Sequence, residues 1–266
     1  YKSTGSANMA FYIIKTNASG QQQWTRTFGG TPNEGSYSII QTFDNGFAVC
    51  GYTASYGAGA KDMQLLKYSD SGQLQWQQTY GGTYDEIAYS LVQTPDSGYL
   101  LTGTSRSYNI NNTNQVYCVR TTATGDTLWT HDYPLDGSHT ALSLSITNGN
   151  YYLIAGKAQL PGIAYTQPFA LKTNQQGDII FEQTYDLGTE VAGIAYSAKE
   201  MPDLRYMLAG SITDPTNGQG RDVLMLKIGE WGEVIDQQSI GTTANDEARS
   251  FCIDDNENIV TVGKAF

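Results

Sequence analysis

The chain has 266 residues, a mass of 29.0 kDa, a formal net charge of −11 and a sequence pI near 4.5. This acidity, with basic residues spread along the chain instead of clustered, argues against a phosphate backbone as partner, so we predict no nucleic-acid binding. No apolar run approaches the roughly 20 residues of a membrane span, and no basic stretch is followed by a hydrophobic core as in a signal peptide. The start at Tyr1 without Met is what we expect of a processed or trimmed chain.

A repeat runs through the whole sequence. Each copy has a basic residue, a glycine five positions later and a bulky residue four positions after that, the last copy excepted. The basic residues are Lys15, Lys67, Arg120, Lys172 and Lys227; the glycines are Gly20, Gly72, Gly125, Gly177 and Gly232; the last positions hold Trp24, Trp76, Trp129, Phe181 and Asp236. The spacings are 52, 53, 52 and 55 residues, which predicts one repeat-built domain over residues 1–266.

Short β-prone segments follow one another along the chain. The first lie near residues 11–15 and 23–28, a full set covers 63–68, 74–80, 88–94 and 99–104, and the last lie near 249–253 and 259–263. No segment has a helical period of apolar residues, so the chain is predicted to be all-β. Glycine-ended turns such as Asp70-Ser71-Gly72 indicate hairpins. In the fourth copy, the turn around Pro202 is interpreted as two residues longer than its counterparts.

Four antiparallel strands repeated five times predict a five-bladed β-propeller. We name the strands of a blade A to D from the axis outward. Strand A is assigned to the segment with small residues at alternate positions, as an axis crowded by inner strands requires. These residues are Ser36 and Ser38, Ala88 and Ser90, Ala141 and Ser143, Gly193 and Ala195, and Ala248 and Ser250. The N-terminal C and D strands would then pair with the C-terminal A and B strands; the alternative phase makes each blade one contiguous copy and needs no such closure.

The repeated residues are interpreted as scaffold. The rings on strand D would fill the wedge between neighbouring blades, and the basic residue on strand C would pair with an acid or lie over an aromatic face. Glycines on strand B would let an adjacent blade approach. They are Gly51, Gly103, Gly156, Gly210 and Gly263.

The segment Ala123-Thr124-Gly125-Asp126-Thr127-Leu128-Trp129 resembles the tryptophan docking motif of quinoprotein-type propellers. The whole copy, including Tyr80-Gly81-Gly82, resembles tandem repeats of secreted and surface proteins of bacteria such as the Bacteroidetes. The resemblance implies a propeller fold and a secreted, cell-surface or periplasmic location. The quinone and calcium site of the quinoproteins has no equivalent here, so we predict no cofactor. A sialidase Asp-box is not matched at residues 69–76, where glycine and aromatic are one residue too far apart.

The loops that join strand B to C and strand D to A emerge on one rim and differ in sequence between copies. Variable loops on a rigid scaffold often carry binding sites. The predicted ligand-binding residues are Tyr56, Tyr84, Tyr108 and Tyr165, whose rings could stack on a sugar or anchor a protein. The alternative is that these tyrosines pack only across their own loops.

The D-to-A loops carry acids at one blade position. Glu34, Glu86, His139 and Asp246 are weak candidates for catalysis, since carboxylates about 5 to 9 Å apart could serve a glycosidase. The alternative is that they cap loops by accepting backbone N–H bonds. Only His131 and His139 occur, and Cys50, Cys118 and Cys252 are interpreted as small buried thiols, so no metal site is predicted.

Three functions remain open at this stage. The first is a non-catalytic secreted or surface propeller, monomeric, that binds a protein or glycan through the variable-loop rim. The second is a carbohydrate hydrolase that uses the acids of the axial funnel, and the third is a structural module of a larger envelope protein.

Overall fold

The structure, a computed structural model, describes residues 2–3, 9–109, 111–213, 220–242 and 244–265. These residues form antiparallel β-sheets and contain no α-helix, which confirms the predicted all-β class. The chain divides into two compact units, Tyr1–Pro134 and Leu135–Phe266, and each is described by itself.

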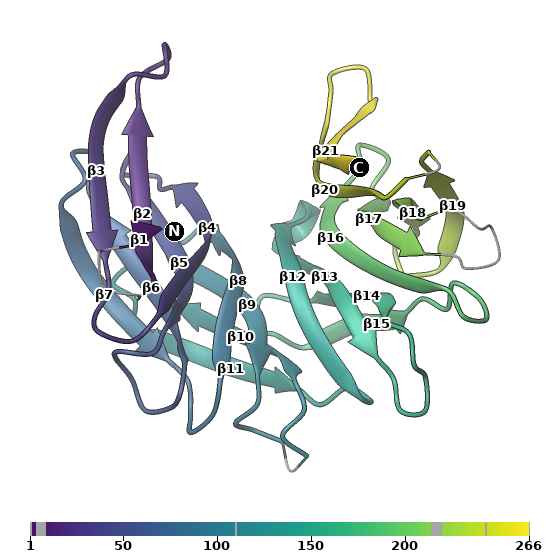
Figure 1. The fold of residues 1–266 in the computed structure, drawn as a ribbon, viewed down its shortest axis with the longest axis horizontal. Coiled ribbons are helices and arrows are strands. Elements are labelled where there is room, and N and C mark those ends of the chain that lie inside the picture. The colour runs from purple at the N-terminus through teal and green to yellow at the C-terminus, as the bar shows by residue number, and fades with distance from the viewer. Residues whose placement is uncertain (1, 4–8, 110, 214–219, 243, 266) are drawn as a thin grey trace. The chain divides into compact units, whose positions relative to one another are not determined.

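The first unit contains three sheets (Figure 1). The first sheet has three strands, β1 (Lys2–Ser3), β2 (Met9–Thr16) and β3 (Gln22–Phe28). The second comprises β4 (Glu34–Gln41), β5 (Phe47–Thr53), β6 (Asp62–Tyr68) and β7 (Leu74–Tyr80). The third comprises β8 (Glu86–Gln93), β9 (Tyr99–Ser105), β10 (Gln115–Thr121) and β11 (Thr127–Tyr133).

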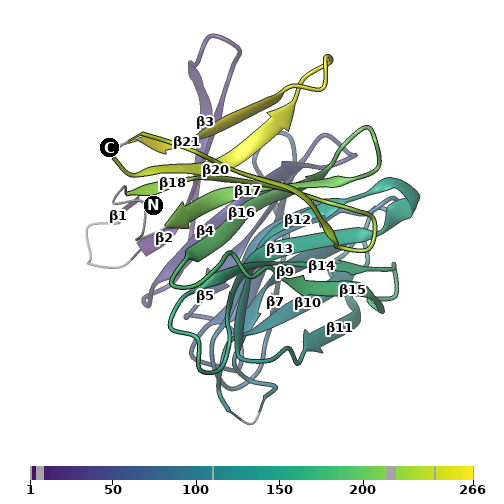
Figure 2. The ribbon, with the colours of Figure 1, turned by 90° about the vertical axis from the view of Figure 1, so that its right-hand side faces the viewer.

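The second unit also contains three sheets, and Figure 2 shows its last hairpin, β20–β21, in yellow. The first sheet comprises β12 (Ser138–Ile146), β13 (Tyr152–Gln159), β14 (Gln167–Thr173) and β15 (Ile179–Thr184). The second comprises β16 (Ala192–Glu200), β17 (Tyr206–Thr213), β18 (Arg221–Ile228) and β19 (Val234–Ile240). The third has two strands, β20 (Asp246–Ile253) and β21 (Ile259–Ala265).

The order of strands within a sheet agrees with the predicted phase. Each four-stranded sheet begins with strand A and runs through B and C to D in chain order. Strands C and D (β2 and β3) are left over at the N-terminal end, and strands A and B (β20 and β21) at the C-terminal end. Among the described residues these two pairs belong to separate sheets, so the predicted closure is not present in the strand pairing.

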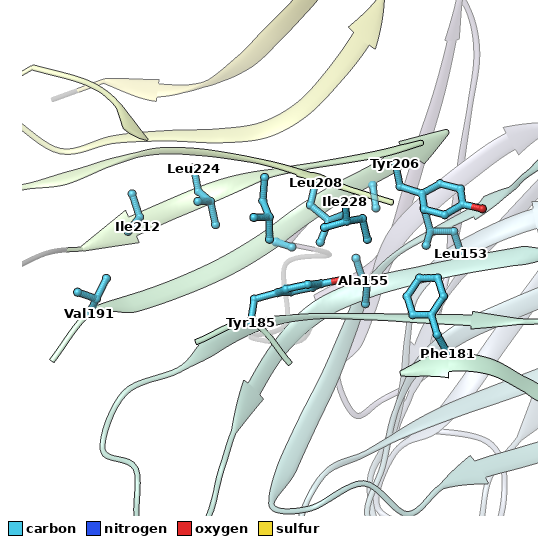
Figure 3. Close-up of a cluster of buried hydrophobic side chains, with 14 residues drawn as sticks. Leu153, Ala155, Phe181, Tyr185, Val191, Tyr206, Leu208, Ile212, Leu224 and Ile228 are labelled. Carbon is cyan, nitrogen blue, oxygen red and sulfur yellow. The ribbon is translucent and has the colours of Figure 1, made fainter. Parts of the chain in front are cut away.

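The hydrophobic core lies between successive sheets within each unit. In the second unit, Leu153 and Ala155 of strand β13 pack with Ala198 of β16 and Leu208 of β17 (Figure 3). Alternate residues of a strand face opposite sides, so strands B and C in the middle of a sheet are buried on both faces. Burial on both faces explains why these strands are nearly continuous in apolar residues.

The rings of strand D lie against the next sheet where both sheets belong to one unit. A Cβ atom built on Gly72 would lie 2.9 Å from the Trp24 ring, and one on Gly125 or Gly232 would lie similarly close to Trp76 or Phe181. These three glycines have φ of +76°, +85° and +86°, a conformation that glycine adopts without strain. The predicted packing of the rings between sheets is therefore present for Trp24, Trp76 and Phe181.

The strand B glycines serve a different purpose from the one predicted. Every strand A contains a β-bulge, at Tyr37, Tyr89, Leu142, Tyr196 and Arg249. The glycine lies opposite the bulge, and a Cβ atom on Gly103 would overlap the carbonyl oxygen of Ile87 in the same sheet. The missing side chain thus makes room for a bulged strand of its own sheet, not for an adjacent sheet.

The fourth copy also differs from its prediction. The turn around Pro202 joins Glu200 to Tyr206 and has the same length as the turn that joins Gln41 to Phe47. The additional residues lie instead in the loop before β16, and Gly193 occupies the position of the acids in this copy. The pair of small residues that matches Ala88 and Ser90 is accordingly Ala195 and Ser197.

The basic residues of strand C have the partners that were predicted. Lys67, Arg120 and Lys227 bind aspartates of the A-to-B turn of their own sheet, namely Asp44, Asp96 and Asp203. The third copy has glycine at that turn position, and there Lys172 lies 4.8 Å from the ring centroid of Tyr151 and 5.2 Å from that of Tyr206.

Candidate functional site: a tyrosine rim in the first unit

Three of the four predicted ligand-binding tyrosines lie on neighbouring loops of the first unit. Tyr56 is in the loop 54–61 between β5 and β6, Tyr84 in the loop 81–85 between β7 and β8, and Tyr108 in the loop 106–114 between β9 and β10. Their exposed fractions are 43%, 47% and 49%. The three rings therefore present large apolar surfaces to solvent from one edge of the sheets.

Hydrogen bonds and close backbone contacts join these loops. The Tyr84 amide donates to Ser107 Oγ at 2.8 Å, and the Arg106 amide donates to the Asp85 carbonyl at 3.1 Å. A Cβ atom on Gly59 would meet the carbonyl oxygens of Gly82 and Tyr84, so the first two loops touch as well. The loops that carry the three tyrosines form a single connected surface, which we call the tyrosine rim (Tyr56, Tyr84 and Tyr108).

Two of the three rings pack against aromatic side chains of the strands. Tyr56 packs against Phe28 with centroids 5.8 Å apart, and Tyr108 against Tyr117 with centroids 5.1 Å apart. Such contacts hold a ring in place while leaving close to half of its surface exposed, so little side-chain entropy remains to be lost on binding. Tyr56 and Tyr108 thus pack against strand residues, and the alternative that the tyrosines pack only across their own loops does not account for their exposed surface.

Tyr165, the fourth predicted tyrosine, belongs to the second unit. It lies in the loop between β13 and β14 and is half-buried. Part of the loop between β17 and β18, residues 214–219, was predicted to belong to the same rim and lies outside the described residues.

The acids of the D-to-A loops accept backbone N–H bonds. Glu86 is fully buried and accepts from the Gly82 amide at 2.6 Å and from Ser105 Oγ at 2.7 Å. Glu34 accepts from the Gly30 amide at 3.2 Å and from Ser55 Oγ, and Asp246 from the Thr242 amide at 2.8 Å. All three carboxylates thus close the loop that precedes their own strand, which agrees with the loop-cap interpretation.

His139 occupies the same position in the third copy and is buried. Its ring packs edge-on against Phe169, with centroids 5.1 Å apart. Burial lowers the pKa of His139 to about 4, although the charge of Asp136 acts in the opposite direction. The imidazole is therefore neutral near pH 7 and replaces the carboxylate of the other copies without adding a charge.

Carboxylates do interact in the first unit, but through residues that the sequence did not single out. Burial raises the pKa of Asp132 to about 6, with a further contribution from the negative charge of Glu86. Burial also raises the pKa of Asp62, which faces the same Gly81 backbone as Glu86. Neither Asp62 nor Asp132 recurs in all copies, and this departure from the repeat is the signal that could have identified them.

Two asparagines that were not predicted as functional residues fix the start of strand C. Asn33 Oδ1 accepts from the Met9 amide, and Asn245 Oδ1 from the Arg221 amide, each at 2.8 Å. Both asparagines directly precede an acid of the D-to-A loop. Each loop therefore binds its own strand A through the acid and strand C of the preceding sheet through the asparagine.

The described part of the chain was also searched for metal sites, free thiols and membrane-spanning helices. No group of three or more His, Cys, Asp or Glu side chains there could hold a metal ion. Cys50 and Cys118 are buried free thiols, as predicted, whereas Cys252 is exposed. The described residues also include no helix that is both long and apolar enough to cross a membrane.

Comparisons with known proteins give only distant similarities. No protein-family model and no curated protein matches the chain. Among solved structures it is similar to MPT-4, a mannose phosphorylase from Leishmania mexicana, with a TM-score of 0.44 and 9% identity over 86% of this chain and 79% of that chain. It is also similar to an endo-1,4-beta-xylanase from Bacteroides thetaiotaomicron, with a TM-score of 0.34 and 10% identity over 86% of this chain and 94% of that one. These low scores assign neither a family nor a function.

Proposed function

We propose that the protein is a non-catalytic binding scaffold that holds a protein or a glycan on its variable-loop rim. The observation that carries the proposal is the tyrosine rim, three half-exposed rings on three loops that contact one another. An exposed tyrosine offers a large apolar face and a hydroxyl at little entropic cost, which suits both sugar rings and protein surfaces. Ring contacts of this kind contribute about 1 kcal/mol each beyond the area they bury.

The proposal includes the architecture. The four strands at the two ends of the chain supply the strand types that a fifth sheet needs, and with it the molecule would be a five-bladed propeller of four antiparallel strands per blade. We also propose that the protein is a monomer and acts outside the cell, at the bacterial surface or in the periplasm. The low content of charged residues, 15%, and the repeat sequence support this location.

A direct test uses a glycan array and a pull-down from bacterial surface extracts, both with purified protein. The double variant Tyr84→Ala/Tyr108→Ala should lose at least tenfold in affinity for whichever ligand is found, because both rings belong to the rim. Phe43→Ala is the matched control, since Phe43 is 65% exposed but lies in an A-to-B turn at the opposite edge of its sheet. Equal binding by wild type and the double variant would refute the assignment to the rim.

Hydrolysis of a carbohydrate is the second candidate, and one observation favours it. Asp62 and Asp132 have raised pKa values, with Glu86 contributing to both, and such perturbed carboxylates occur at catalytic sites. A screen of chromogenic glycosides separates the two functions. Turnover that is abolished by Glu86→Gln would overturn the non-catalytic proposal, whereas no turnover by the wild type would agree with it.

A further inference from the structure

Three basic side chains of the second unit converge on one buried carboxylate. Glu247 lies near the start of strand β20 and is 4% exposed. Its Oε1 accepts from Arg249 Nε at 2.7 Å, and its Oε2 accepts from Arg221 Nη1 of β18 at 3.0 Å. Lys264 Nζ of β21 lies 3.8 Å from Oε1. Three strands thus contribute to one charged group, which we call the Glu247 cluster (Glu247, Arg221, Arg249 and Lys264).

The cluster carries more positive charge than its carboxylate neutralises. Burial acts to raise the pKa of Glu247, but the bonds from Arg249 and Arg221 outweigh it and lower that pKa, so the carboxylate is charged near pH 7. Three cations therefore face a single negative charge. The side chains of Arg221, Arg249 and Lys264 are 44%, 45% and 58% exposed, so the cations also face solvent.

The two acids adjacent in sequence have their carboxylates bonded elsewhere. Asp246 accepts from the amide and the hydroxyl of Thr242, at 2.8 and 2.9 Å. Asp222 accepts from Ser239 Oγ at 3.0 Å. The chain as a whole has a net charge of −11, which repels anions at long range. An anion that binds this protein therefore needs a local site, and the Glu247 cluster is one.

The cluster departs from the repeat at two of the positions that carry its charges. The residues that match Glu247 in the other copies are Gly35, Ile87, Thr140 and Ile194. Arg249 is the bulged residue of its strand, and its counterparts are Tyr37, Tyr89, Leu142 and Tyr196. Bulges commonly re-aim a side chain near functional sites. Charges that only one copy has are not needed to build the repeat, which indicates a role beyond the scaffold.

Arg249 also contacts the preceding sheet. Its guanidinium carbon lies 4.0 Å from the centroid of the Tyr196 ring, as in a cation–π contact. The guanidinium is thus held by both a carboxylate and a ring, so less side-chain entropy remains to be lost when an anion binds. Tyr196 itself is half-buried, so part of its ring is accessible beside the cations.

We propose that the Glu247 cluster binds the carboxylate of an acidic sugar. This is a second site, separate from the tyrosine rim, and it rests on the proposed function only in taking the ligand to be a glycan. Guanidinium groups present N–H donors in a planar fork that matches a carboxylate. Arg221 and Arg249 already share the carboxylate of Glu247, so their spacing suits a group of that size. The accessible part of Tyr196 offers an apolar surface to the sugar ring.

An NMR titration of the ¹⁵N-labelled full chain tests the proposal, with D-glucuronate as probe and D-glucose as its neutral counterpart. We expect a saturable shift of the Arg249 Nε–Hε signal with glucuronate and none with glucose. Acetate, which has the carboxylate but no sugar ring, should bind at least about fivefold more weakly. Because the cations are exposed, the affinity for glucuronate should fall as the salt concentration rises.

Two variants and a matched control separate the cluster from general electrostatics. Arg249→Gln should weaken glucuronate binding by about fivefold, as expected for the loss of a well-formed exposed ion pair. Arg205→Gln removes the same charge from the same unit, and Arg205 is 51% exposed in the turn between β16 and β17, so this control should bind as wild type does. Lys264→Gln changes the outermost cation and should weaken binding by about twofold with an unchanged melting temperature.

The outcomes that would overturn the proposal are distinct. No saturable shift in the wild type, or equal losses of affinity in Arg249→Gln and Arg205→Gln, would refute the site. Equal affinities for glucuronate and acetate would refute the assignment to a sugar. If glucuronate binds as expected but Tyr84→Ala/Tyr108→Ala leaves ligand binding at the tyrosine rim unchanged, only the proposed function fails.

Discussion

Arg120 and Lys172 occupy the same position of strand C, yet different groups hold them. Arg120 Nη2 donates to both oxygens of Asp96 at 2.6 Å, whereas Lys172 lies over the rings of Tyr151 and Tyr206. Burial acts to raise the pKa of Asp96, but bonds from Thr94, Arg120 and Gly98 outweigh it and lower the pKa to about 2. The repeat thus preserves a cation and allows its partner to change.

At the residue scale, this difference predicts a pH dependence. Asp96→Asn should reduce the free energy of unfolding at pH 7 by about 1 kcal/mol, a figure that allows for solvent around the 60% exposed carboxylate. The folded pKa lies below the unfolded value of about 3.9, so the stabilisation is complete above that pH and is lost as the pH falls towards 2. Denaturant unfolding of wild type and of Asp96→Asn at pH 7, 4, 3 and 2.5 measures how the difference in their unfolding free energies changes with pH.

Lys172→Met provides the control for this experiment. Its partners are rings that do not titrate in acid, so the difference between Lys172→Met and wild type should stay constant from pH 4 to 2.5. An effect of Asp96→Asn that is as large at pH 2.5 as at pH 7 would contradict the assigned ion pair.

At the scale of the element, the bulge in strand A requires a glycine at the opposite position of strand B. Gly103→Ala should cost about 3 kcal/mol in unfolding free energy, because the new methyl group would overlap the backbone carbonyl of Ile87, which cannot rotate away. Gly20→Ala is the control, since no atom lies within 4 Å of its Cβ position and only its φ of +77° is unfavourable. That strain costs about 1 kcal/mol. Equal losses in urea unfolding would refute the steric explanation.

The strands themselves could be predicted from the sequence, but the bulges could not. Ser36 and Ser38 are spaced as in a regular strand, yet they pair with the adjacent residues Gly51 and Cys50 because Tyr37 is bulged out. Period-two spacing is the same with or without a bulge, so only the partner strand reveals it. The insertion in the fourth copy was misplaced because Gly193 replaces the acid that marks the position in other copies.

The candidate site was predictable to a similar extent. Exposed tyrosines on variable loops follow from composition and loop position, and Tyr56, Tyr84 and Tyr108 do lie on adjoining loops. The acids were placed correctly at the loop ends, but whether a carboxylate accepts an amide bond depends on backbone geometry that spacing does not fix. The raised pKa values of Asp62 and Asp132 arise from burial, which a single sequence does not reveal.

At the scale of the whole molecule, both units share one building plan. Each has complete four-stranded sheets and one incomplete sheet, and the incomplete sheets carry exposed apolar side chains such as Ile14 and Val262. Repeat proteins derive their stability from contacts between neighbouring copies, so an uncovered end is weakly stabilised. If it completes the proposed fifth sheet, the C-terminal hairpin is the element whose removal should affect the whole chain most.

Deletion of Asn258–Phe266 removes strand β21 together with Phe266, which lies outside the described residues. If the hairpin completes the fifth sheet, the truncated chain should lose its single cooperative transition and unfold over a broad range, because the first and last sheets then have no common partner. Thermal unfolding followed by circular dichroism and calorimetry would detect the change. Deletion of Tyr1–Ser3 is the control, since β1 pairs only with Met9 and Ala10 and its loss should leave the transition sharp. A melting curve unchanged by the C-terminal deletion would mean that β21 contributes only to its own hairpin, and the proposed closure would then be wrong.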